Sequence, residues 1–284
     1  MNDKITIVCS TQIPHIVRLY TAMALGVPAG RVRIIKPYIG GGFGNKQDVL
    51  YEPLNAYMSM QVGGRPVRLE ISREETIYGT RTRHQITGHT KAVVTKDGQI
   101  LSRKMEAFAN NGGYASHGHA ICANCGNVFK ELYIDKIGTE VDCWTVYTNA
   151  PTAGAMRGYG IPQSVWITEC LTDDLARKIG MDPLEIRLKN CIPAGFKDPH
   201  NGITFHSYGL KDSIIKGAEL AKWKEKRAEY DKPQSGEKRR GIGMAIFCYK
   251  TGVYPISLET ASARMVLNQD GSAQLFMGAT EIGQ

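Results

Sequence analysis

The N-terminal part of the chain changes between β-branched runs and helical spacing. Residues 4–12 have the dense Ile and Val content of a buried strand, and 13–28 place apolar side chains at helical spacing up to a helix-ending Gly26. A second strand is predicted over 31–39 and a second helix over 47–64, with a glycine-rich stretch between them. This order predicts a mixed α/β unit whose polar loops lie at the ends of its elements, where sites usually form.

The middle of the chain is predicted to form a sheet. Strand-like runs cover 65–75, 84–114 and 139–149, and the sequence KDG at 96–98 supplies a hairpin turn inside the second run. Amphipathic helices follow over 164–180 and over 182–190, and a third helix is predicted over 210–233. In the second of these helices Asp182 is the N-cap and Pro183 takes the first helical position.

A polar linker separates the last helix from a hairpin-like segment over 261–281. We expect a first domain over 1–210, a helix and linker over 211–238, and the truncated start of a second domain over 239–284. The elements together predict the α+β class, with mixed α/β character.

Composition limits the function classes. The chain has 284 residues, 42% of them hydrophobic, which is enough for a sizeable core. Its net charge of +8 could attract nucleic acid, an acidic partner or a phosphate-bearing cofactor. The densest basic stretch, 222–240, is interleaved with acidic residues and lacks an aromatic stripe, so a solvated helix and loop is favoured over a nucleic-acid-binding module.

Cysteine usage indicates a reducing compartment. The seven cysteines are scattered, and the chain shows neither a signal peptide nor a long apolar run, so we expect a cytoplasmic protein without a membrane segment. Cys122 and Cys125 form a CxxC near His117 and His119, but no second pair follows at zinc-site spacing. Loop residues beside a buried site are therefore favoured over a metal site.

The glycine-rich stretch YIGGGFGNKQD, residues 38–48, fits neither common nucleotide motif. A P-loop requires Gly-Lys followed by Ser or Thr, whereas here Asn45 separates Gly44 from Lys46 and Gln47 follows. A Rossmann fingerprint requires a second strand after the glycines, whereas a helix is predicted there. The stretch is either a simple turn or a loop that brings bare backbone close to a ligand.

Two further loops have the same character. Residues 150–163 hold Arg157 among small residues just before a helix, and 278–284 form a glycine-bounded turn after a strand. The planar fork of arginine suits an anionic or oxo group. The loops together suggest one large ligand.

These motifs identify a family resemblance. The sequences STQ at 10–12, GGGFGNK at 40–46, AMRGYGIPQ at 155–163 and TEIGQ at 280–284 resemble, in this order, the molybdenum-binding subunits of the xanthine dehydrogenase and aldehyde oxidase family. The resemblance covers essentially the whole chain and implies the molybdopterin-binding domains of the xanthine oxidase family. It implies a molybdopterin cofactor, with the cytosine dinucleotide form left open. It also implies FAD and 2Fe-2S centres on partner subunits, because the cysteines lack ferredoxin-like spacing.

The resemblance also implies site residues. Gln12, Phe43 and Arg157 would surround the molybdenum, and Gln47 and Tyr159 would flank the substrate. The residues expected to bind the cofactor are Gln12, Gly42, Phe43, Gly44, Arg157 and Gln284.

The expected activity is hydroxylation of a xanthine- or hypoxanthine-like purine, or a related N-heterocycle, with water as the oxygen source. An aldehyde-type substrate and a non-catalytic scaffold are the alternatives. Animal purine enzymes carry Glu at the position of Gln47, which leaves the substrate open. The resemblance implies that the family's general-base glutamate lies beyond residue 284. Glu281 belongs to the pterin motif and is not expected to act as the general base. The chain resembles an internal piece of such a subunit or a split-gene product.

Overall fold

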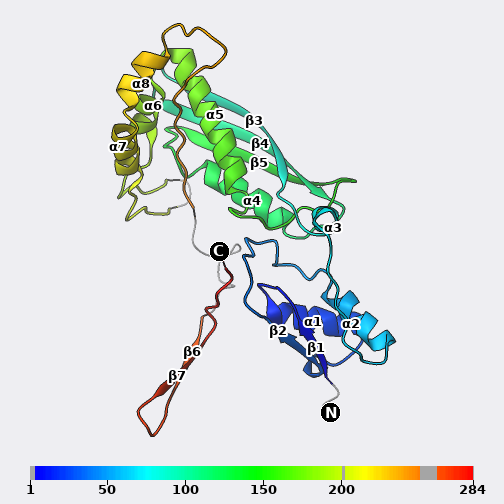
Figure 1. The fold of residues 1–284 in the computed structure, drawn as a ribbon. Coiled ribbons are helices and arrows are strands. Elements are labelled where there is room, and N and C mark those ends of the chain that lie inside the picture. Colours follow the sequence, from blue (N-terminus) through cyan, green and yellow to red (C-terminus); the bar gives the residue numbers. More distant parts are fainter. Residues whose placement is uncertain (1–3, 200–201, 250–260, 284) are drawn as a thin grey trace.

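The N-terminal unit is a strand–helix–strand–helix arrangement, as predicted. The structure is a computed structural model that describes residues 4–199, 202–249 and 261–283. Strand β1 (Ile5–Val8) pairs in parallel with β2 (Val32–Ile35), and α1 (Pro14–Leu25) connects them. Helix α2 (Glu52–Gln61) packs against α1 (Figure 1). The core of this unit contains Ile7, Ala22, Val32 and Ala56.

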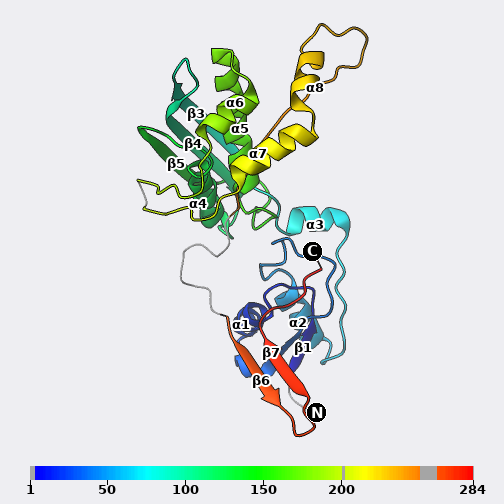
Figure 2. The ribbon, with the colours of Figure 1, turned by 90° about the vertical axis from the view of Figure 1, so that its left-hand side faces the viewer.

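A second body is built on a sheet of three strands in the order β3 (Gln85–Val94), β4 (Ile100–Gly112) and β5 (Gly138–Tyr147). The first pair is antiparallel and the second parallel. The predicted turn at 96–98 is confirmed, because Thr95 N donates to Gln99 O at 2.9 Å. Helices α4 (Gly118–Phe129) and α5 (Ile161–Ile179) lie together on one face of the sheet (Figures 1 and 2). The core between them contains Met105, Ala107, Cys125, Phe129 and Ile167.

Helix α6 (Pro183–Asn190) begins as predicted, because the Asp182 side chain accepts a hydrogen bond from Leu184 N. The single helix expected over 210–233 is instead two helices, α7 (Leu210–Leu220) and α8 (Trp223–Tyr230). Lys222 breaks them with a left-handed φ of 53°. This bend buries Trp223, whose indole Nε1 donates to Asp182 Oδ1 at 3.0 Å.

Besides the single helix over 210–233, two further sequence predictions were wrong. Residues 65–72 form no strand, and α3 (Arg73–Gly79) begins at a capping box made by Ser72 and Glu75. The second is the loop expected around Cys122, which is α4. Its glycine and cysteine content gave no helical signal, but these small side chains allow close packing: a Cβ at Gly126 would lie 2.8 Å from Cys143 Sγ on β5.

The predicted C-terminal hairpin is confirmed as β6 (Ala263–Leu267) and β7 (Ala273–Met277), which pair antiparallel. Its apolar side chains are exposed, including Met265, Leu267, Leu275, Phe276 and Met277. An isolated hairpin is only marginally stable in water. These exposed apolar side chains therefore form a surface against which another segment or protein would pack. Within residues 4–199, 202–249 and 261–283, no helix is long and apolar enough to cross a membrane.

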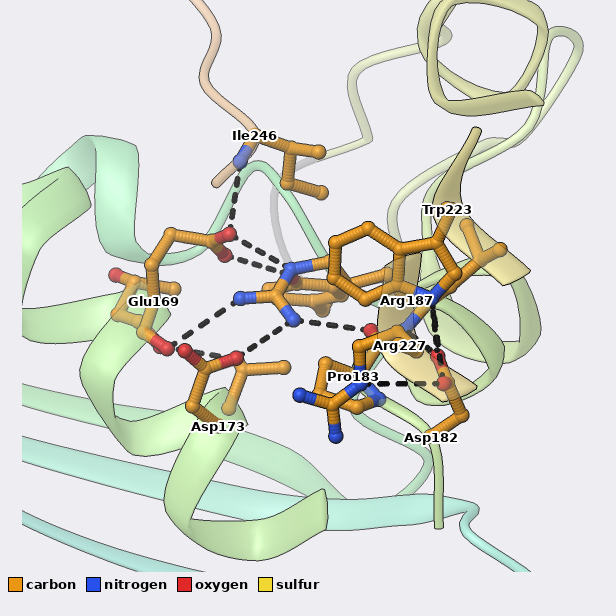
Figure 3. Close-up of polar contacts among 12 residues, drawn as sticks. Glu169, Asp173, Asp182, Pro183, Arg187, Trp223, Arg227 and Ile246 are labelled. Carbon is orange, nitrogen blue, oxygen red and sulfur yellow. Dashed lines mark hydrogen bonds and ion pairs between the residues drawn. The ribbon is translucent and has the colours of Figure 1, made fainter. Parts of the chain in front are cut away.

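A buried ionic network joins the helices of the second body (Figure 3). The Glu169 carboxylate accepts hydrogen bonds from the Tyr133 hydroxyl at 2.5 Å, Arg187 Nε at 2.8 Å and Ile246 N at 2.8 Å. Arg187 also contacts Asp173 at 2.8 Å. Burial and the charge of Glu169 raise the pKa of Tyr133 well above its ordinary value, so its hydroxyl remains a donor. One carboxylate therefore fixes α5, α6 and the segment around Ile246.

We predict that Glu169→Ala destabilises the protein by about 3–5 kcal/mol, because it leaves the buried Arg187 guanidinium without its main counter-charge. The side chain of Arg187 is 0% exposed and that of Glu169 is 6% exposed. Denaturant unfolding measures the loss, and hydrogen exchange should accelerate at the Ile246 amide.

Asp174→Ala is the matched control on the same helix. It breaks a pair with Arg177 whose side chains are 77% and 61% exposed, and it should cost less than about 1 kcal/mol. Equal losses in the two variants would show that the Glu169 network is not what holds the helices together.

Candidate functional site

The glycine loop, residues 38–48, is an ordered double turn after β2. Asn45 N donates to Gly42 O at 2.9 Å, and Gln47 N donates to Gly44 O at 3.0 Å. Phe43, inside the first turn, has a left-handed φ of 51° and is 36% exposed. The loop thus presents an aromatic ring on a fixed backbone.

Gln12 is bonded to the glycine loop by both its backbone and its side chain. Its N–H donates to Lys46 O at 3.0 Å, and its Oε1 accepts from Gly44 N at 3.0 Å. A Cβ at Gly42 would lie 2.5 Å from Gln12 Cδ, so only glycine permits this approach. Lys46 Nζ donates to Ser10 Oγ at 2.7 Å and joins the same two segments. Since Oε1 is engaged by the backbone, Nε2 is the end of the amide that can donate elsewhere.

The loop before α5 lies against the glycine loop. A Cβ at Gly44 would lie 3.0 Å from the backbone carbon of Ala155, and Arg157 Cζ lies 5.8 Å from the centroid of the Phe43 ring. Arg83 Nη2 donates to Arg157 O at 2.6 Å, which fixes the backbone while the Arg157 side chain is exposed. The predicted residues Gln12, Gly42, Phe43, Gly44 and Arg157 are therefore brought together.

Tyr159 and Gln47 lie in these same loops. Tyr159 has a left-handed φ of 48°, its carbonyl accepts from Asn124 Nδ2 at 2.7 Å, and its hydroxyl lies 2.9 Å from His117 Nδ1. Burial, and then the charge of Asp48, raise the pKa of the Tyr159 hydroxyl. Gln47 is half-buried at the end of the second turn.

A polar cluster around Asp48 was missed by the sequence reasoning. Arg81 Nε and Ser116 Oγ both donate to Asp48 Oδ2 at 2.7 Å, and His117 Nε2 lies 3.7 Å from Asp48 Oδ1. The sequence indicates His117 only as a possible metal ligand near the CxxC. That CxxC lies inside α4, where Cys122 and Cys125 are buried.

Backbone strain is concentrated here. Among the described residues, the non-glycine residues with positive φ are Phe43, Ser116, Tyr159 and Lys222. Three of them lie in the loops that meet at this place, whereas Lys222 lies at the α7–α8 bend. Such strain costs about 1–3 kcal/mol per residue and tends to persist where function needs it.

The C-terminal motif returns to the glycine loop. Lys36 Nζ donates to Glu281 O at 2.7 Å, and a Cβ at Gly283 would lie 2.8 Å from Gly41 N. Figures 1 and 2 both show this end of the chain beside the loop that follows β2. The Glu281 carboxylate accepts from Gly283 N and so caps its own turn. Gln284 lies outside the described residues.

The converging loops offer hydrogen-bond donors and glycine backbone to a ligand. Within the described part of the chain, no group of three or more His, Cys, Asp or Glu residues could hold a metal ion. A separate cavity of about 200 Å³ lies at the far end of α5, lined by residues such as Arg177, Trp223 and Met244. The converging loops, not this cavity, contain the predicted residues.

Comparison with known proteins shows the family of the chain. The family described as a molybdopterin cofactor-binding domain matches residues 1–191, and a second family of the same description matches 216–284. A putative xanthine dehydrogenase molybdenum-binding subunit of Escherichia coli is 46% identical over 283 residues, which is 100% of this chain and 37% of that protein. The nicotinate dehydrogenase large molybdopterin subunit of Eubacterium barkeri is 36% identical over 76% of this chain and 51% of its own length.

Solved structures share the fold. The aldehyde oxidoreductase of Desulfovibrio gigas superposes with a TM-score of 0.80 at 28% identity, over 96% of this chain and 29% of that chain. The aldehyde oxidoreductase of Desulfovibrio desulfuricans gives a TM-score of 0.83 at 26% identity over the same shares. This chain thus spans a little over a third of the first relatives' length. With matches covering both 1–191 and 216–284, the chain belongs to the molybdopterin cofactor-binding domain family.

Proposed function

We propose that this chain is the cofactor-holding part of a molybdenum hydroxylase subunit that oxidises a purine or a related N-heterocycle. The observation that carries the proposal is the approach of Gln12 to Gly42 and Gly44, with Arg157 over the Phe43 ring on the neighbouring loop. These contacts bring an amide donor, a guanidinium and glycine backbone close to one another.

These residues fit the molybdenum cofactor. Its pterin supplies the sulfur ligands of the metal, so the protein needs donors and space rather than a His or Cys cluster. Gln12 and Arg157 would donate to oxo or anionic groups, with Gly42, Phe43 and Gly44 against the cofactor. Gln284 would bind it through the motif that lies on Gly41. When bound, the cofactor supplies the two-electron oxidation that hydroxylates the substrate carbon with oxygen from water.

The protein's own residues would bind and orient the substrate. Phe43 and Tyr159 are aromatic groups held in strained conformations, which suits them to contact a flat heterocycle. Gln47, at the end of the second turn, would offer an amide donor and acceptor to the ring substituents.

Relatives' names support an N-heterocycle. They refer to xanthine, hypoxanthine and nicotinate, and the 46% identity to a xanthine dehydrogenase subunit favours a xanthine- or hypoxanthine-like purine. An aldehyde is the second candidate, because the superposed structures are aldehyde oxidoreductases at 28% and 26% identity. Substrate profiling of the complete enzyme separates them.

We also propose an FAD-binding subunit and a 2Fe-2S subunit as partners in a cytoplasmic complex. Electrons removed from the substrate need acceptors, and the cysteines of this chain lack ferredoxin-like spacing. The proposed division of the chain is a first domain over 1–210, a helix and linker over 211–238 and the start of a second domain over 239–284. We propose no nucleic-acid partner.

The function predicts that the native full-length complex contains molybdenum and converts a purine to its hydroxylated product with oxygen from isotope-labelled water. Elemental analysis and mass spectrometry of the product measure both. A complex that binds molybdenum and oxidises only aldehydes would overturn the purine assignment, and one without molybdenum would overturn the function.

A matched glycine pair tests the site itself. Gly42→Ala should lower molybdenum content and activity several-fold, because its Cβ would lie 2.5 Å from Gln12 Cδ and force that side chain away. Gly40→Ala is the control, since a Cβ at Gly40 would meet nothing within 4 Å. Equal loss in both variants would place the cofactor elsewhere.

Gln47→Glu should add a new pH dependence to kcat/KM for the purine, because an ionisable group in the free enzyme appears in that parameter. The amide of Gln47 donates and accepts at every pH, whereas a carboxylate changes from donor to acceptor as it ionises. The pH profiles of the two enzymes measure the effect. Superimposable profiles would place Gln47 outside the substrate pocket.

A further inference from the structure

Asp48, His117 and Tyr159 form a line of polar groups that the proposed reaction does not yet use. His117 Nδ1 lies 2.9 Å from the Tyr159 hydroxyl, and His117 Nε2 lies 3.7 Å from Asp48 Oδ1. The two rings meet edge to face, with centroids 5.8 Å apart. The three residues come from the glycine loop, from the turn before α4 and from the loop before α5.

The surroundings fix this line in place. Asp48 is held by Arg81 and Ser116, both at 2.7 Å. Tyr159 is held by the hydrogen bond from Asn124 to its carbonyl, at 2.7 Å. The side chains of His117 and Asp48 are only 30% and 19% exposed. The Asp48 carboxylate, paired with the Arg81 guanidinium, therefore lies at a fixed place beside Nε2 of the imidazole.

The oxygens of this carboxylate favour one tautomer of a neutral imidazole. With the proton on Nδ1, the lone pair of Nε2 would face Asp48, which is repulsive. With the proton on Nε2, the N–H faces the carboxylate and Nδ1 becomes an acceptor. The spacing of 3.7 Å is too long for a hydrogen bond, so Asp48 acts through its charge. The Tyr159 hydroxyl, whose pKa is raised by burial and by Asp48, then donates to Nδ1.

A phenol that donates its only proton to histidine presents its oxygen lone pairs to whatever lies on the other side. We propose that Asp48 and His117 set Tyr159 as a hydrogen-bond acceptor for a ring N–H of the substrate. Tyr159 is then a specificity-determining residue, and His117 and Asp48 are positioning residues. The substrate part of this inference rests on the proposed function.

The tautomer is tested without turnover. In the full-length subunit labelled with 15N-histidine, the His117 signals should show a protonated Nε2 and an unprotonated Nδ1, and Tyr159→Phe should shift the Nδ1 signal. A proton on Nδ1, or on both nitrogens, would overturn the inference. His119→Gln, an exposed histidine two residues away, identifies signals unrelated to the line and should leave those of His117 unchanged.

The acceptor role is tested with xanthine and its mono-N-methyl derivatives. Tyr159→Phe should raise KM for xanthine roughly two- to tenfold with kcat nearly unchanged, as expected for loss of one neutral hydrogen bond. For the derivative whose methyl group replaces the contacted N–H, the same variant should have no effect. Tyr57→Phe, an exposed tyrosine on α2, is the control and should change nothing.

The coupling between His117 and Tyr159 is tested with His117→Leu. Its effect on KM should vanish in the Tyr159→Phe background, because the histidine acts only through the phenol. Additive effects, or equal loss for every methylxanthine, would overturn the acceptor role. A complex that hydroxylates no purine refutes the proposed function and leaves the tautomer measurement standing. An active complex with the opposite tautomer refutes only the line from Asp48 to Tyr159.

Discussion

The candidate site depends on a contact that only glycine allows. Gln12 reaches the backbone of Gly44 because Gly42 leaves room for its side chain, and this hydrogen bond joins the end of the first strand to the loop after the second. The neighbouring contacts follow from it, since Phe43 lies inside the first turn of this loop and its ring lies beside Arg157. One missing methyl group thus determines where an aromatic ring, an amide and a guanidinium can meet.

The strained loops rest on rigid elements. The backbone of Tyr159 is held by Asn124 on α4, and the helix that follows it, α5, is fixed near its middle by the Glu169 network. A strained loop conformation persists only if the structure around it prevents the loop from relaxing. The sheet and its two helices supply that resistance, so the stability of the distant ionic network and the geometry of the loops are linked through one helix.

Local signals predicted much of this fold, and long-range contacts account for what they did not predict. The N-cap at Asp182 and the hairpin turn at 96–98 are encoded by adjacent residues and were identified. Helix α4 was missed because its small residues gain their helical preference from packing against β5. In the site, the motifs indicated which loops meet. The bonds from Asp48 to Ser116 and from Tyr159 to His117 join residues 68 and 42 positions apart, and no local pattern reports such pairs.

The contact between the C-terminal motif and the glycine loop has a consequence for synthesis. Lys36 and Glu281 are separated by 245 residues, so the glycine loop emerges from the ribosome long before the segment that lies on it. At elongation rates of about 5–20 residues per second, the delay is roughly 10–50 s. During that interval Gln12 and Gly44 can already bond while the face later covered by Gly283 is open. Newly made protein therefore passes through a period in which a large ligand could reach the loop from that side.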